Sequence, residues 1–346
     1  MNEKPAPDDP RKPDSPGDLT KRSWRYVARK VVREFVDDQC LDLAAALTYY
    51  AVLATFPAAL ALVSLLGLVG RAEESVDTAL EVLGPLLSDR TIAAVEPTLR
   101  SLATSDAAGP ALLVGLAGAL WSASGYIGAF GRAMNRIYEI REGRPFWKLR
   151  PLMLLITLAA VLLSAVVLLL LVVSGPVAEA IGDVVGMSDN AVLVWDVAKW
   201  PALAVIVMLV VAMLYFATPN VQQPKFRWLS VGAVVAIVTW VLASVGFAFY
   251  VANFSSYDRT YGSIGAVIVS LLWLWITNLA LLLGAEIDAE LERGRELQAG
   301  MPAEKEIQLP ARDTRNIVKA ERKEQEDIEL GRRIRTHRAN QSRDDG

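Results

Sequence analysis

The sequence contains a single cysteine, Cys40, and a single histidine, His337, and this scarcity excludes several classes of protein. One cysteine cannot form an intramolecular disulfide, and two such residues cannot supply a cysteine and histidine metal cluster. A glycine-rich phosphate-binding loop is also missing, so ATP-driven transport by this chain alone is not expected. The sequence indicates no catalytic residue, no cofactor and no metal site.

The first forty residues lack the apolar core of a secretory signal peptide, so the first spanning helix is expected to direct insertion. Long apolar runs are abundant instead. Hydrophobic residues make up 53% of the chain, and the mean hydropathy is +0.33 although both ends are densely charged. Several runs reach the roughly 18 to 20 residues that a helix needs to cross a bilayer. We predict an all-α polytopic membrane protein with a six-helix bundle in residues 41–290. The spans are predicted at 43–69, 110–131, 151–173, 198–217, 229–251 and 262–285.

The segments that flank the spans differ in character. Residues 1–20 are rich in proline and charge and predict a disordered tail. Residues 21–40 predict an amphipathic helix, which either lies on an anionic leaflet or packs on the protein's own cytoplasmic face. Residues 71–108 are too polar to span and predict an extracytoplasmic amphipathic segment. Residues 291–346 predict a charged, partly helical and largely solvated cytoplasmic tail.

The distribution of lysine and arginine orients the bundle. The amino-terminal segment holds 9 of them, the loops after the second and fourth spans hold 6 and 2, and the carboxy-terminal tail holds 13. The three opposite segments hold only 3, 1 and 1. Positive charge is retained in the cytoplasm, so both termini are predicted to be cytoplasmic, as expected for the inner membrane.

Proline and small residues predict structural roles within the spans. Pro57 lies near the middle of the first span and is expected to kink it. The second span is rich in glycine, alanine and serine, which let helices approach closely, so we place it at the centre of the bundle. The residues assigned structural roles are Pro57, Gly115, Gly118, Gly125, Gly262 and Gly265.

Polar residues in or beside the spans are the candidate functional residues, because burial in lipid is costly without partners. Thr48 and Thr55 share one stripe of the first span, which is either a packing seam or a polar path. Four charged residues lie at similar depth near the cytoplasmic ends of the spans: Asp42, Arg132, Arg136 and Glu286. They either form a cluster or act locally, Asp42 in helix capping and the arginines in snorkelling. The turn at 253–265 is either an interfacial hairpin or a ligand site. The candidates for a polar path or lipid contact are Asp42, Thr48, Tyr49, Tyr50, Thr55, Ser122, Arg132, Asn135, Arg136, Asn253, Tyr257, Tyr261, Ser263, Asn278 and Glu286.

Four groups of residues in this sequence resemble motifs of one family. They are Leu43–Tyr50 with Phe56–Pro57, Leu120–Gly125 followed by Arg132–Tyr138, Asn253–Tyr257 with Tyr261–Gly265, and Leu283–Glu286. In this order, over residues 25–293, the chain resembles the YihY/virulence factor BrkB family. At Asp288 many members are expected to carry asparagine, so no role is assigned there. The resemblance implies a six-helix inner-membrane protein, often labelled ribonuclease BN, with some members linked to envelope lipid transport or serum resistance.

The residues do not support the ribonuclease label. Metal-dependent RNA hydrolysis usually needs clustered histidine and carboxylate ligands, and the only histidine lies in a polar tail. A net charge of −3 and the absence of a basic, aromatic binding module also argue against a nucleic-acid partner. Two hypotheses remain: the bundle moves or flips a lipid or envelope precursor, or it is a non-transporting membrane scaffold that recruits envelope-biogenesis partners. Membrane lipids are the expected partners. A cytoplasmic protein partner for the carboxy-terminal tail and a homo-oligomer are left open.

Overall fold

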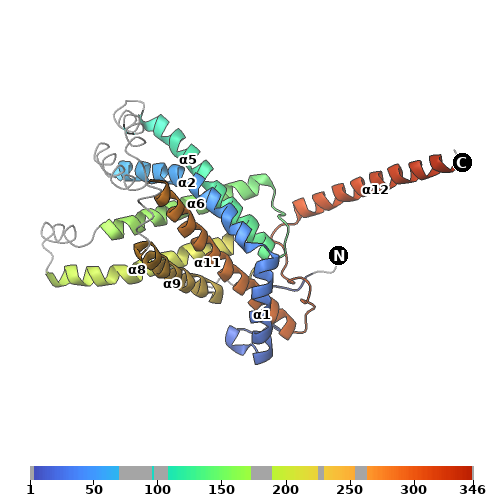
Figure 1. Cartoon of the computed structure of the whole chain (residues 1–346), viewed down its shortest axis with the longest axis horizontal. Helices are drawn as coiled ribbons and strands as arrows, with labels where there is room; N and C mark the ends of the chain where they lie inside the picture. The colour runs from blue at the N-terminus through green and yellow to red at the C-terminus, as the bar shows by residue number, and fades with distance from the viewer. Residues whose placement is uncertain are drawn as a thin grey trace.

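The computed structural model describes residues 4–69, 96, 108–172, 189–224, 230–253 and 263–344, and most of these residues lie in long helices (Figure 1). The predicted all-α architecture is confirmed. The elements are the short 3-10 helix η1 (Pro16–Asp18) and the α-helices α1 (Lys21–Asp37), α2 (Cys40–Val69), α5 (Ala108–Ile137), α6 (Phe146–Val172), α8 (Asp189–Ala217), α9 (Val231–Asn253), α11 (Ser263–Gln298) and α12 (Arg315–Asp344).

The six predicted spans coincide with α2, α5, α6, α8, α9 and α11 to within a few residues at most ends. Within the described residues, four helical stretches are long and apolar enough to cross a membrane, and Cys40–Thr55 is a shorter apolar helix. The four stretches are Phe146–Leu171, Val197–Ala217, Val231–Val251 and Val267–Gln298. The multi-pass helical architecture therefore stands, while the total of six spans remains a prediction.

The core of the bundle is formed mainly by α2, α5 and α11. The most extensive packing is between α2 and α5 and between α9 and α11, and α11 also packs against α1 and α2. Leu47, Phe130, Met134 and Leu282 are almost fully buried in this core. By contrast, Leu155 on α6 and Phe249 on α9 are well exposed, as expected for side chains that face lipid rather than water. The contacts of α5 with α2, α6, α8 and α11 agree with its predicted central place.

Two glycines bring α9 and α11 into close contact. A Cβ atom built on Gly232 would lie 2.0 Å from the carbonyl oxygen of Gly284, and a Cβ on Gly284 would lie 2.4 Å from the carbonyl oxygen of Gly232. No side chain fits between the two backbones at this point, so glycine is required on both helices.

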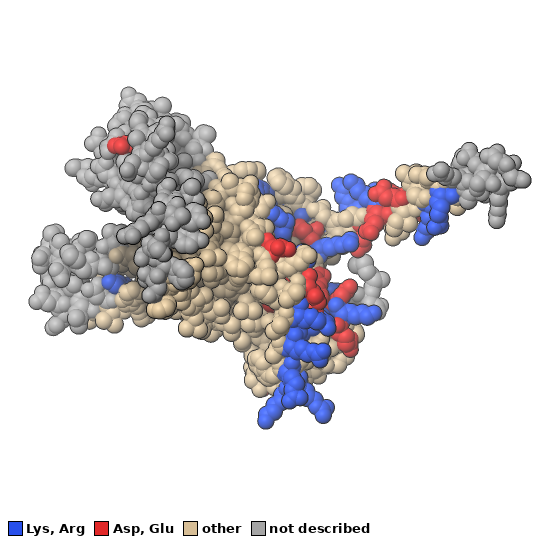
Figure 2. All heavy atoms as spheres, in the orientation of Figure 1, with Lys and Arg blue, Asp and Glu red and all other residues tan. Residues whose placement is uncertain are grey.

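The charged end of the bundle is defined here as α1, the loops at 138–145 and 218–224, residues 286–298 of α11, and residues 4–20 and 299–314. Described parts of the four segments that the lysine and arginine count predicts on the cytoplasmic side meet there. Lys12 Nζ lies 2.8 Å from Glu292 Oε1, and Asn220 Nδ2 donates to the carbonyl oxygens of Arg141 and Asp313 at 3.0 and 2.9 Å. Figure 2 shows charged side chains gathered at this end and along α12.

Two expectations about the ends of the chain need correction. Residues 4–20 are not a disordered tail, because Lys12 and Leu19 are buried against the rest of the protein. The solvated tail does not start at 291, because α11 continues to Gln298 and Ile307 and Leu309 are buried. In both segments, ion pairs and a few apolar residues offset the cost of burying charge. Among the described helices, α12 projects away from the body (Figure 1).

Several expectations fall outside the described residues. They include the amphipathic segment at 71–108 apart from residues 96 and 108, and the candidates Tyr257, Tyr261 and Gly262. Asn253 and Ser263 end α9 and begin α11, and Pro57 and Gly115 lie within α2 and α5. The predicted kink at Pro57 therefore stays a prediction, and the turn at 253–265 stays open between an interfacial hairpin and a ligand site.

Candidate functional site

A buried polar triad joins three helices inside the bundle. Asn278 on α11 donates through Nδ2 to Thr48 Oγ1 on α2 at 3.2 Å and accepts from the Tyr126 hydroxyl on α5 at 2.9 Å. Asn278 is 2% exposed and Thr48 is 7% exposed. The side-chain oxygens of all three residues thus have partners away from water. At Thr48 the polar stripe of α2 therefore contacts α11 through a hydrogen bond of the kind that joins membrane helices.

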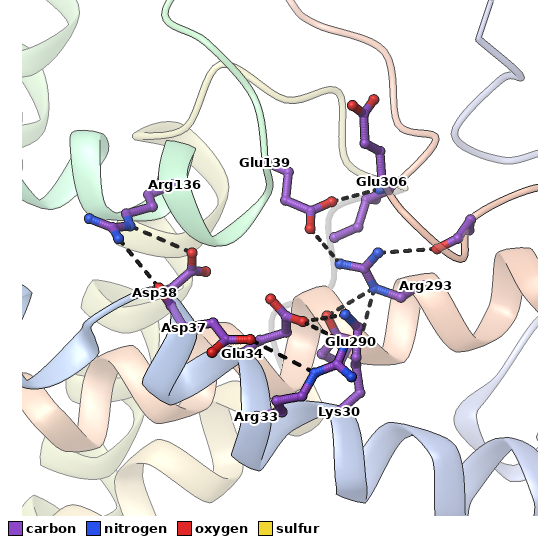
Figure 3. A network of polar contacts seen from close by, with 12 residues as sticks. Lys30, Arg33, Glu34, Asp37, Asp38, Arg136, Glu139, Glu290, Arg293 and Glu306 are labelled. Atoms are coloured by element: carbon purple, nitrogen blue, oxygen red, sulfur yellow. Dashed lines mark hydrogen bonds and ion pairs between the residues drawn. The ribbon is translucent and has the colours of Figure 1, made fainter.

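At the charged end, Arg293 is the centre of a buried ionic network (Figure 3). Its side chain is 1% exposed. Its Nε donates to both carboxylate oxygens of Glu290 at 2.9 and 3.0 Å, Nη1 donates to the carbonyl oxygen of Ala303 at 3.1 Å, and Nη2 donates to Glu139 Oε1 at 2.9 Å. Glu139 Oε2 accepts the backbone N–H of Ile307 at 3.0 Å. The network fixes residues 303–307 against the end of α11.

A second polar group joins the two loops of the charged end. Asn135 Oδ1 accepts the backbone N–H of Asn220 at 2.7 Å, and Asn135 Nδ2 donates to Glu142 Oε2 at 3.0 Å. Arg144 donates to both oxygens of Glu142, through Nε at 2.8 Å and Nη2 at 2.7 Å. Burial opposes ionisation of Glu142, but the hydrogen bonds from Arg144 outweigh it and lower the pKa of Glu142 below its usual value. This group holds the loops together.

The corner between α1 and α2 carries the most unusual carboxyl group. Glu286 on α11 is fully buried, and its Oε1 accepts a weak hydrogen bond from Cys40 Sγ at 3.7 Å. Glu286 Oε2 has no hydrogen-bond partner among the described residues. Asp38 ends α1 within hydrogen-bonding reach of Glu286 and pairs with Arg136 of α5 at 3.5 Å. The corner turns at Gln39, whose φ is +56°.

A cavity of about 260 Å³ opens at the charged end between α8, the start of α9 and α11, and Pro16 of η1 lines it from the amino-terminal segment. Its wall is mostly apolar. The polar groups that line it include Tyr138, Tyr215, Ser230, Asp288, Glu292 and Arg295. Asp288 Oδ1 accepts the backbone N–H of Gly232 at 2.7 Å, and Arg295 donates to Glu292 at 2.5 Å. The volume is slightly below the roughly 300–1,000 Å³ of pockets that hold drug-sized ligands.

The predicted cluster of Asp42, Arg132, Arg136 and Glu286 is divided in the structure. Arg136 lies at the corner with Glu286, although it pairs with Asp38 and with Gln39 Oε1 rather than with Glu286 itself. The Arg132 guanidinium lies 5.4 Å from the centre of the Tyr50 ring, a cation–π contact. Asp42 is exposed. The residues predicted at similar depth are therefore near one end of the bundle, but they do not form one site.

The remaining candidates lie at the surface or in helix contacts. Tyr49 is 62% exposed and meets the Tyr50 ring edge-on. Ser122 is exposed, and exposed Thr55 donates to the carbonyl oxygen of Ala51 on its own helix. Gly125 faces Tyr50 across the α2–α5 contact, Gly118 is in open space and Gly265 is buried. None of these residues lines the cavity.

The sequence interpretation missed the residues that shape the charged end, among them Lys12, Asp38, Glu290, Arg293 and Asp288. They lie in segments whose sequence pattern predicts solvated tails or helix ends. One available signal was the spacing of Glu286, Glu290 and Arg293, which places three ionisable residues along one face of a continued helix. Within the described residues, no group of three or more histidine, cysteine or carboxylate side chains is arranged to hold a metal ion.

The helical bundle, its lipid-facing leucines and its charged end define a polytopic membrane protein. The family model of virulence factor BrkB matches residues 31–307. The chain belongs to this family, as its sequence motifs indicated.

Individual relatives agree with this assignment. The ribonuclease-like protein YfkH of Bacillus subtilis, whose name carries that label only provisionally, is 32% identical over 73% of this chain and 90% of its own length. A UPF0761 membrane protein of Alkalilimnicola ehrlichii is 30% identical over 77% of this chain and 57% of its own. Another, from Halorhodospira halophila, is 26% identical over 80% of this chain and 59% of its own. The chain thus spans little more than half of these two UPF0761 proteins. No solved structure matches the chain.

Proposed function

We propose that this protein moves or flips an amphipathic lipid or envelope precursor across the inner membrane. The observation that carries the proposal is the cavity at the charged end. Its mostly apolar wall includes Phe216 and Val231, and its polar groups include Asp288 and Arg295. A lipid headgroup with the first part of its chains has the same division into polar and apolar parts, and the volume suits a headgroup rather than a whole lipid.

The orientation belongs to the same proposal. The charged end faces the cytoplasm, because the lysine and arginine excess lies there and both terminal segments pack there. On α1, Val27 and Val31 pack towards Leu291, while Val32 and Val36 are 69% and 66% exposed. The helix thus packs on the protein with one side and offers the other side, flanked by arginines, to the anionic leaflet. Reporter fusions at the carboxy terminus test this orientation, and an extracytoplasmic signal would contradict it.

The test of transport uses the full chain reconstituted in liposomes that contain a fluorescent phospholipid. A membrane-impermeant quencher added outside reports how fast labelled lipid from the inner leaflet reaches the outer one. Asp288→Asn keeps the acceptor for the Gly232 N–H but removes the negative charge from the cavity. Asp327→Asn, on exposed α12, is the matched control. Because a charged hydrogen bond contributes about 1.5–3 kcal/mol, we expect Asp288→Asn to slow movement at least about tenfold and the control to leave it unchanged.

Folded wild-type protein that accelerates no phospholipid and no envelope precursor would refute the transport proposal. Equal rates of lipid movement for Asp288→Asn and wild type would instead show that the cavity is not on the transport pathway.

We further propose that the chain is not a ribonuclease, because its one histidine lies on the projecting α12 and its net charge is −3. RNA cleavage by purified protein with added divalent metal ions would contradict this.

The scaffold hypothesis is favoured by one observation, the projecting helix α12. Its Leu330 and Ile334 side chains are 58% and 64% exposed, as expected for a helix that binds a partner. Asn316 still contacts the 143–144 loop, donating from its backbone N–H to Gly143 and from Nδ2 to Arg144. Deletion of residues 325–346 therefore removes the outer part of α12, including Leu330 and Ile334, and keeps both Asn316 and the Glu324–Arg141 ion pair (3.7 Å) at the charged end. Under the scaffold hypothesis this deletion abolishes function in cells, whereas under the transport proposal vesicle activity and cellular function both survive.

A further inference from the structure

The corner at Asp38–Cys40 and the buried Glu286 form an arrangement that neither helix packing nor the cavity explains. Glu286 is 0% exposed, yet in the described part of the chain the one hydrogen-bond donor that reaches it is the thiol of Cys40 at 3.7 Å, and its Oε2 has no partner there. A thiol is a weak donor. An ionised carboxylate buried in this way would cost several kcal/mol, because neither a cation nor a strong donor compensates its charge.

The basic side chains nearby are already engaged by other acids. Arg136 pairs with Asp38 at 3.5 Å, Arg293 holds Glu290 and Glu139, and Lys30 forms an ion pair with Glu34. The titratable groups that act on the corner come from α1, α2, α5, α11 and the loop after α5. They are Lys30, Glu34, Cys40, Arg136, Tyr138, Glu139, Glu290 and Arg293.

Asp38 lies against Glu286, so this second carboxyl group increases the free-energy cost of an ionised Glu286 instead of lowering it. Two carboxyl groups in contact cannot both ionise without strong repulsion. Burial raises the pKa of Asp38, while the hydrogen bond with Glu286 and the charge of Arg136 oppose the rise only in part. A single proton placed between the two groups supplies the missing donor and removes one of the two negative charges.

We propose that Asp38 and Glu286 form a proton-binding site in which one proton, carried by Glu286, is shared with the Asp38 carboxylate at neutral pH. The site joins the α1–α2 corner to α11. When the proton leaves, the charge of the fully buried Glu286 faces that of the half-buried Asp38, and the corner must separate from α11 or Arg136 must turn towards both. The state of protonation therefore controls how the amino-terminal helix is seated on the bundle.

The site suggests a way to supply energy for lipid movement, since the chain has no nucleotide-binding loop. That role rests on the proposed function, whereas the proton site itself does not. A protein that moves no lipid would still hold the proton. The experiment below measures protonation without any transport, so failure of one proposal is distinguished from failure of the other.

The test is infrared spectroscopy of the full chain in lipid nanodiscs, which detects the C=O stretch of protonated carboxyl groups. At neutral pH we expect this band in wild type and in Glu329→Gln, a matched variant on the exposed face of α12. Glu286→Gln removes the proton carrier and should abolish the contribution of the pair. In Asp38→Asn the charged acceptor of the shared proton becomes a neutral amide, so the hydrogen bond of the Glu286 proton weakens and the contribution of the pair shifts in frequency.

The outcomes separate the possibilities. Absence of a protonated-carboxyl band in the folded wild type overturns the proposal without recourse to any variant. A band unchanged in Glu286→Gln overturns it too, because another acid then carries the proton. Loss in Glu286→Gln with an unchanged band in Asp38→Asn shows that the proton is not shared, which contradicts the pair. Circular dichroism confirms that each variant is folded before its spectrum is compared.

Discussion

The contact between Gly232 and Gly284 gives the sharpest prediction about packing. An alanine Cβ at residue 232 would lie 2.0 Å from the Gly284 carbonyl oxygen, whereas ordinary contacts begin near 3.4 Å. Helices α9 and α11 would have to separate locally by roughly the difference, 1.4 Å. Overpacking of this kind costs about 1–3 kcal/mol, and the separation also weakens the hydrogen bond from the Gly232 N–H to Asp288. We expect Gly232→Ala to lower the free energy of unfolding by at least about 2 kcal/mol.

Gly246 on the same helix is the matched control, because a Cβ built there meets nothing within 4 Å. Gly246→Ala should be neutral or more stable by up to about 1 kcal/mol, since alanine favours helix over glycine. Trp240 donates to Thr277 across the α9–α11 contact at 3.1 Å, so tryptophan fluorescence reports on this interface during unfolding by SDS in mixed micelles. If Gly232→Ala is as stable as Gly246→Ala, the close approach of the two helices is refuted.

Three further predictions concern buried polar groups. Arg293→Met should destabilise the fold by about 3–5 kcal/mol by stranding the Glu290 carboxylate, and adding Glu290→Leu should recover part of that loss; equal unfolding midpoints for the single and double variants would contradict this. The lowered pKa of Glu142 contributes stability that is present above its unfolded pKa of about 4.3 and is lost as the pH falls through the folded value. Glu142→Gln should therefore cost stability at neutral pH and little in strong acid, as pH-dependent melting would show. Asn278→Leu should cost about 1–3 kcal/mol by leaving the Tyr126 hydroxyl unpaired, and Asn278→Asp tests whether an acceptor alone rescues it.

The helices of the bundle were predictable because lipid imposes a simple rule on sequence. A segment such as 151–173 is apolar all round, so its length alone indicates a helix that faces lipid. Asn278 was also predictable as an interhelical hydrogen bond, because an amide in such a segment needs a partner. Its particular partners, Thr48 and Tyr126, were not, since spacing along one helix does not say which neighbour it meets.

The charged end was harder to predict because ionic partners are remote in the sequence. Lys12 pairs with Glu292, and Arg293 pairs with Glu139. Each segment alone reads as polar and solvated, and hydropathy cannot distinguish a charge in water from a charge buried beside its counter-ion. The disorder predicted for residues 1–20 was wrong for residues 4–20 for this reason.

The cavity and the contact between α9 and α11 are joined by hydrogen bonds. The N–H of Gly232 donates to Asp288 in the cavity wall, and the Tyr215 hydroxyl, which also lines the cavity, donates to the carbonyl oxygen of Leu281 on α11. A variant that separates α9 from α11 must therefore change the cavity as well. Loss of lipid movement in Gly232→Ala would accordingly not locate the site, whereas loss in Asp288→Asn with unchanged stability would.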